Sequence, residues 1–101
     1  MSLSVQTRKG LSRYLIDADV PANALGLHVS ELAPGAMAHP AHTHAASEAF
    51  YVLEGRAAVE IAGERCEFGP NEAIVLDARK PHAIANAGDT RLRYLVVIAG
   101  R

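Results

Sequence analysis

Two histidines and a glutamate lie close together in the segment HTHAASEAF, and their types and spacing suit a metal ion. Side chains two residues apart on a β-strand project from the same face, so His42 and His44 would lie side by side. Glu48 follows at an even interval, so it returns to that face or arrives on the next strand if residues 45–47 bend. Imidazole and carboxylate together favour a divalent transition metal (Fe, Mn, Ni, Co, Cu or Zn) over Mg²⁺ or Ca²⁺.

The residues around these ligands alternate between apolar and polar types in short runs, which is typical of β-strands. Gly, Pro or Asn separates most of the runs, and the pairs EG at 54–55 and AG at 62–63 are typical of tight hairpins. The predicted strands are residues 12–16, 25–32, 41–44, 49–53, 56–61, 65–68, 73–76, 82–86 and 91–98. Short strands at this density predict an all-β sandwich or barrel.

One stretch also fits a helix, because His44 and Glu48 have the i,i+4 spacing of helical neighbours and alanines stand between them. The residues that follow at once, Phe50, Tyr51 and Val52, are aromatic and β-branched and favour a strand. The strand is therefore the preferred prediction for this stretch.

Length and composition narrow the classes of protein. The 101 residues predict one domain over 1–101 with one core. A net charge of -1 lacks the basic surplus that binding to nucleic acid or to an anionic membrane surface needs. No apolar run approaches the roughly 20 residues of a membrane-spanning helix, and no secretion signal is visible, so we expect a cytoplasmic protein. Cys66 is the single cysteine, which excludes an intramolecular disulfide.

Two motifs of the chain resemble those of the cupins. The first cupin motif, G-x5-H-x-H-x3(4)-E-x6-G, is matched by His42, His44, Glu48 and Gly55, with Gly35 one residue early. The second, G-x5-P-x-G-x2-H-x3-N, keeps its end in the segment PHAIAN. The opening of this second motif differs, since Asn71, Asp77 and Arg79 stand where it has Gly, Pro and Gly. The two motifs span about residues 35–86, and the resemblance extends from about residue 25 to 98.

The resemblance implies a double-stranded β-helix, the jelly-roll barrel of cupins. It also implies that His42, His44, Glu48 and His82 ligate one divalent transition metal, with open coordination positions facing the barrel interior. A homodimer built by sheet-to-sheet packing is implied as well. The apolar residues on the outer faces of the predicted strands would be buried in such an interface. We expect the N-terminal strand to reach across to the partner.

Alternating residues near the predicted metal site are candidates for a small pocket that binds a ligand. We assign to it first the apolar side chains and then two polar ones: Phe50, Val52, Ile61, Ile84, Tyr94, Asn86 and Arg79. Arg79 has two interpretations, a solvated turn charge or a cation that grips a substrate carboxylate. His39 has odd parity relative to His42 and His44, so it is expected to point away, as a loop or rim histidine.

Two functions remain open. The first is a small metal-dependent enzyme, of oxygenase, isomerase or lyase type, acting on an oxygen-rich or acidic small molecule. The alternative is a non-catalytic module that binds or senses a small ligand or a metal. Because the predicted barrel takes up the whole sequence, which leaves no output segment for a sensor, the enzyme is preferred.

Overall fold

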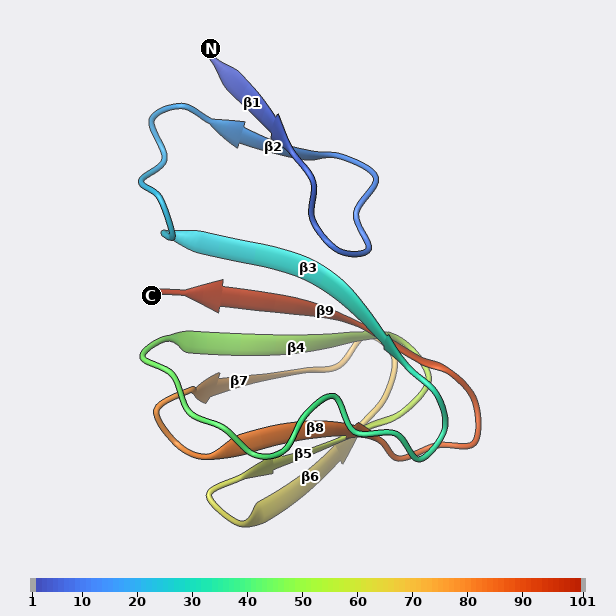
Figure 1. Cartoon of the computed structure of the whole chain (residues 1–101). Coiled ribbons are helices and arrows are strands. Elements are labelled where there is room, and N and C mark those ends of the chain that lie inside the picture. The colour runs from blue at the N-terminus through green and yellow to red at the C-terminus, as the bar shows by residue number, and fades with distance from the viewer. Residues whose placement is uncertain (1, 101) are drawn as a thin grey trace.

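The described part of the chain, residues 2–100 of a computed structural model, consists of β-strands and loops without a helix (Figure 1). The strands are β1 Leu3–Gln6, β2 Tyr14–Asp17, β3 Leu25–Leu32, β4 Ser47–Glu54, β5 Ala57–Ile61, β6 Glu64–Phe68, β7 Ala73–Asp77, β8 His82–Asn86 and β9 Leu92–Ala99. The predicted all-β class is confirmed, and the helical alternative for the segment around residues 44–48 is wrong. The described residues contain no helix that is long and apolar enough to span a membrane.

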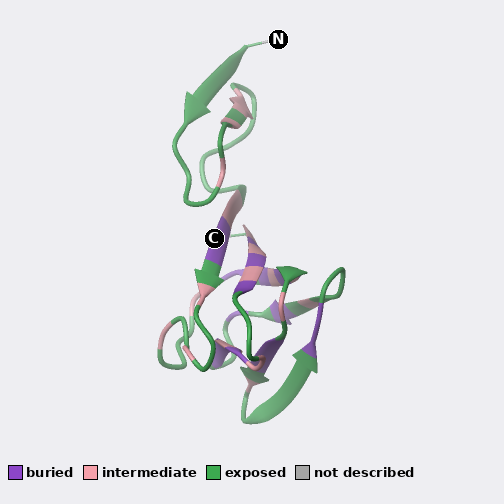
Figure 2. Ribbon diagram, turned by 90° about the vertical axis from the view of Figure 1, so that its right-hand side faces the viewer, coloured by how far each residue is buried: buried purple, intermediate pink, exposed green. Residues whose placement is uncertain are grey.

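Two antiparallel sheets enclose the core. One has the strand order β3-β9-β4-β7 and the other has the order β6-β5-β8. Alternate residues of β4 are buried, as its pattern of apolar residues predicts, and Phe50 and Val52 are 3% and 0% exposed. From the second sheet, Val59 and Ile84 fill the space between the layers. Figure 2 shows the buried residues gathered in this body, whereas the N-terminal strands are largely exposed.

The strand register determines which side chains share the inner face of the larger sheet. His28 pairs with Val96, which pairs in turn with Phe50, and so these residues form one row across β3, β9 and β4. The next rows pair Ile98 with Glu48 on one side, and Ser30 with Tyr94 on the other. Because Phe50 faces the core, the residues in register with it or two positions away face the same interior.

The segment between β3 and β4 is a loop, so the predicted strand at residues 41–44 is wrong. The loop runs beside β8 and pairs with it at two isolated positions, Met37 with Ala85 and His42 with His82. Beyond His42 the backbone turns away, because the His44 amide donates to the Ala78 carbonyl at 2.9 Å. Pro40 also lacks the N–H that a continuous ladder requires.

The N-terminal strands form a hairpin outside the two sheets, visible at the top of Figure 1. β1 was not predicted. β2 begins two residues after the start of the strand predicted at residues 12–16. β1 pairs with β2 alone, in an isolated two-stranded sheet. The turn of this hairpin touches β3, where the Val29 amide donates to the Lys9 carbonyl at 2.9 Å.

Candidate metal centre

Three histidines from two parts of the chain meet at one end of the space between the sheets. His42 and His44 come from the loop before β4, and His82 is the first residue of β8. One ring nitrogen from each lies within 4.8 Å of the others. The backbone pair between His42 and His82, with both hydrogen bonds at 3.1 Å, holds the loop against β8. The approach of the three rings is therefore set by main-chain hydrogen bonding.

Glu48 adds a carboxylate to the three imidazoles. Its Oε1 lies 3.0 Å from His44 Nε2 and 3.7 Å from His82 Nε2. Glu48 is 5% exposed and projects inward from β4, in register with Ile98 of β9. The four predicted ligands, His42, His44, Glu48 and His82, are thus brought together.

His82 is oriented by a hydrogen bond on the side of its ring away from Glu48. Its Nδ1 lies 2.9 Å from the Lys80 carbonyl oxygen, which can only accept, so Nδ1 donates. In the neutral ring the lone pair then resides on Nε2, the atom that faces Glu48. A hydrogen bond of this kind on the second nitrogen is what usually orients a metal-binding histidine.

Two buried ring nitrogens in the described residues lack a hydrogen-bond partner, His44 Nδ1 and His82 Nε2. A buried polar atom without a partner costs about 1–3 kcal/mol, so two within one cluster call for a bound species. Nitrogen donors with a neighbouring carboxylate are the set that a divalent transition metal prefers. The residues present therefore fit such an ion.

His39 stacks on His42, with ring centroids 3.8 Å apart. It therefore lies at the rim of the cluster and does not point away, because the irregular loop does not follow strand parity. Partial burial of the ring lowers the pKa of His42, and the positive charge that His39, His82 and His44 can carry lowers it further. Its neutral, ligating form is thereby favoured.

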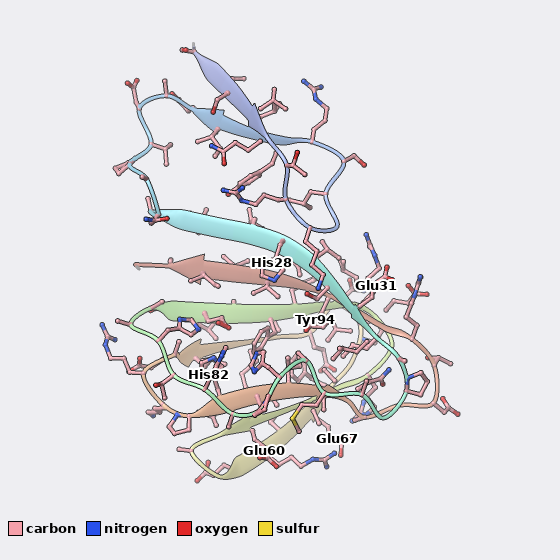
Figure 3. The ribbon with its side chains drawn as sticks, viewed as in Figure 1. His28, Glu31, Glu60, Glu67, His82 and Tyr94 are labelled. Atoms are coloured by element: carbon pink, nitrogen blue, oxygen red, sulfur yellow. The ribbon has the colours of Figure 1, made fainter. Side chains whose placement is uncertain are left out.

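A cavity of about 290 Å³ adjoins the histidines. Its walls come from the hairpin turn, β3, the loop, β4, β8 and β9: Lys9, His28, Ser30, Ala38, His39, His42, His44, Glu48, Phe50, Ile84, Tyr94, Val96 and Ile98. Figure 3 shows the labelled His82, Tyr94 and His28 one after another from the side of β8 to the side of β3. Of the predicted pocket residues, Phe50, Ile84 and Tyr94 line this cavity.

The structure places the other predicted pocket residues elsewhere. Val52 is fully buried, and Ile61 packs against the same apolar core. The Asn86 side chain is buried and occupied, donating to the carbonyls of Leu32 and Thr90 at 3.0 and 2.7 Å. The Asn86 side chain therefore stabilises the turn before β9.

Arg79 also lies away from the cavity walls, in the turn between β7 and β8. Its side chain is 66% exposed and contacts the Asp77 carboxylate at 3.2 Å. The backbone N–H and guanidinium of Arg79 lower the pKa of Asp77. This placement agrees with the interpretation of Arg79 as a solvated turn charge.

Sequence reasoning missed several polar residues of the cavity, among them Lys9, His28 and Ser30. The alternation of β3 held a signal for two of them, because His28 and Ser30 share its inward parity. Lys9 carried no such signal, since its position depends on a turn that contacts β3 from outside the sheets.

The family model described as a cupin domain matches residues 28–98. An uncharacterised protein of Methanocaldococcus jannaschii is 30% identical over 88 residues, which cover 86% of this chain; the match spans 60% of that relative's length. The relative is thus longer than the segment it shares with this chain.

Solved structures agree on the fold. The cupin domain of a transcriptional regulator from Enterobacter cloacae is 24% identical with a TM-score of 0.70, covering 78% of this chain and 84% of that one. A structure from Silicibacter pomeroyi, described as a sugar phosphate isomerase of the cupin superfamily, is 23% identical with a TM-score of 0.68, covering 77% and 52%. These similarities show the jelly-roll fold.

Proposed function

We propose that this chain, which belongs to the cupin domain family, holds one divalent transition metal ion through His42, His44, His82 and Glu48. The observation that carries the proposal is the close group of three histidines beside the buried Glu48 carboxylate, with His82 Nε2 facing that carboxylate and unpartnered. The metal, when bound, supplies a Lewis acid that can polarise an oxygen of a small molecule.

We further propose that the adjoining cavity binds an oxygen-rich or acidic small molecule on which the protein acts as an enzyme. A volume of about 290 Å³ suits a metabolite of modest size. Phe50, Ile84 and Val96 provide apolar walls that exclude water, and Tyr94 and Ser30 provide hydroxyl groups. Such walls orient a ligand through few polar contacts.

The metal proposal is tested by replacing a ligand. We expect the parent protein to bind about one metal ion per chain and His44→Ala to bind at least roughly 100-fold more weakly, because changes in the ligand's surroundings alone cost 10–100-fold. Metal content by elemental analysis after dialysis, and cobalt titration, measure this. The variant should remain folded, because His44 lies in a loop.

His39→Ala is the matched control, since His39 stacks on His42 yet lies outside the close group of three histidines. This variant should bind the same number of metal ions per chain as the parent protein. If His44→Ala binds metal as tightly as the parent does, the proposed ligand set is wrong.

The second candidate function is a ligand-binding module without catalysis. The similarity of fold to the cupin domain of a transcriptional regulator favours keeping this candidate. Mass spectrometry of small molecules released from the purified protein separates the two functions. A molecule recovered unchanged after prolonged incubation with the metal-loaded protein supports the module, and its conversion supports the enzyme.

A further inference from the structure

The cavity has a second polar end on β3. His28 and Ser30 face the interior from this strand, and both line the cavity. β9 lies between β3 and β4, the strand that carries Glu48. Because adjacent strands are about 4.8 Å apart, the β3 side lies roughly 10 Å across the sheet from the carboxylate side. The cavity therefore extends away from the three histidines toward a distinct group of polar residues.

Lys9 is held at this second end by the hairpin turn. The Lys9 carbonyl accepts a hydrogen bond from the Val29 amide at 2.9 Å, between the two cavity residues His28 and Ser30 of β3. Gly10 follows with a φ of 75°, and a Cβ at that position would lie 2.6 Å from the Val29 carbonyl oxygen. The turn lies so close to β3 that only glycine fits at residue 10, and the exposed Lys9 beside it is one of the residues that line the cavity.

The charge of the cavity walls is uneven. Lys9 is the only lysine or arginine among the lining residues, and Glu48 is the only carboxylate. Glu48 is already engaged with His44 at the metal end. Between the two ends the walls are apolar, formed by Phe50, Val96 and Ile84. The β3 end thus offers a cation with no carboxylate among its neighbours in the wall.

We propose that Lys9 is the specificity-determining residue of this cavity, binding the anionic group of a small acid whose other end ligates the metal. The ligand class is a carboxylic acid with two adjacent oxygen donors at one end, a short apolar chain, and an anionic group at the other. This inference rests on the proposed metal site, and it assigns to Lys9 the role that the sequence suggested for Arg79.

A pair of probes isolates the distal charge. Both 2-oxoglutarate and 2-oxopentanoate carry the same chelating 2-oxo acid on a five-carbon chain, and they differ only in a distal carboxylate or methyl group. With a metal–oxygen bond of about 2.1 Å and a hydrogen bond of about 2.8 Å, this chain spans roughly the distance between the two ends. Binding is read from the visible spectrum of the cobalt-loaded protein.

We expect the parent protein to bind 2-oxoglutarate about tenfold more tightly than 2-oxopentanoate, because the distal carboxylate gains a charge-assisted hydrogen bond. Lys9→Gln should reduce the ratio of the two affinities to about one, without weakening the binding of 2-oxopentanoate. Lys9→Arg should restore part of the preference. Arg79→Gln, which changes an exposed cation outside the cavity, should leave both affinities unchanged.

The outcomes separate this inference from the proposed function. If cobalt binds and both probes change its spectrum, but the parent shows no preference or Lys9→Gln retains it, Lys9 has no such role and the metal site stands. Equal weakening of both probes by Lys9→Gln would also overturn the inference, because a loss of structure affects both. If no cobalt binds, or neither probe alters its spectrum, the proposed function itself fails.

Discussion

The candidate metal centre lies at the edge of the apolar core, with His42 exposed, His44 half-buried, and Glu48 and His82 buried. His82 is fully buried and Glu48 nearly so, while Ala46, Leu76 and Ile84 belong to the surrounding apolar cluster. Burying such groups is costly unless each polar atom has a partner. The Lys80 carbonyl satisfies one nitrogen of His82, and the second nitrogen faces the other ligands. The arrangement stabilises the protein fully only when the remaining nitrogens are bound.

The buried Tyr94 makes the stability of the protein depend on pH. Burial raises the pKa of Tyr94 above 10.0; a hydrogen bond with Ser30 acts in the opposite direction, and the charge of Glu48 also raises the pKa. The unfolded chain therefore releases this proton at lower pH than the folded chain does, so stability is lost as the pH rises above 10.

We expect the free energy of unfolding, measured with urea, to fall between pH 9 and about 11 by more in the parent than in Tyr94→Phe, which has no proton to release there. Tyr51→Phe is the control, because its hydroxyl donates to Asn71 near the surface. Equal losses in the parent and in Tyr94→Phe would show that Tyr94 does not carry this dependence.

Among the elements, the loop before β4 and the strand β8 together make the site. On a strand His42 and His44 would share one face, whereas the observed loop bends after its pairing with β8 and brings both rings beside His82. The hydrogen bonds of the loop to Ala78 and Ile84 fix its path at both ends. Main-chain hydrogen bonds therefore position the loop that carries His42 and His44.

The hairpin between β4 and β5 has a tightly packed glycine at its turn. Gly55 has a φ of 90°, and a Cβ there would lie 2.9 Å from the Leu92 Cα of β9. We expect Gly55→Ala to lower the free energy of unfolding by about 3 kcal/mol, since backbone strain adds to a clash with main-chain atoms that cannot move aside.

Gly63→Ala is the matched control for this substitution. Gly63 has a similar φ of 85°, but nothing lies within 4 Å of a Cβ at that position. Gly63→Ala should lower the free energy of unfolding by about 1 kcal/mol, from the backbone conformation alone. Urea unfolding of both variants measures the difference, and equal costs would mean that the approach of β9 to Gly55 is not tight.

The outer face of the larger sheet carries a row of apolar side chains that are half-buried or exposed. The register aligns Leu27, Val97, Ala49 and Val75 in one row across its four strands. Val75, at the edge of this row, is 76% exposed. An accessible row of apolar side chains is typical of an interface between protein copies.

We therefore expect a homodimer, measured by sedimentation at tens of micromolar protein. Val75→Glu should shift the population to monomer, because a carboxylate would be buried without a partner. Met37→Glu is the control, since Met37 is similarly exposed, at 57%, but lies beside β8 of the other sheet. A parent protein that sediments as a monomer would contradict the expected dimer.

Most strands of the two sheets, and the histidine and glutamate side chains that come together, could be predicted from the sequence. Period-two alternation encodes which side of a strand is buried, and so residues 25–32 and 82–86 were predicted with their observed bounds. The spacing of His42, His44 and Glu48 encoded the cluster, although the backbone that presents it is a loop.

The surroundings of the cluster depend on contacts between residues far apart in the sequence. Asn86 and Arg79 are close to His82 in sequence, yet hydrogen bonds with neighbouring turns hold both side chains away from the cavity. Lys9 is distant in sequence, yet its contact with Val29 brings it to the cavity wall. Such long-range contacts depend on how turns close and sheets stack, which local periodicity does not record.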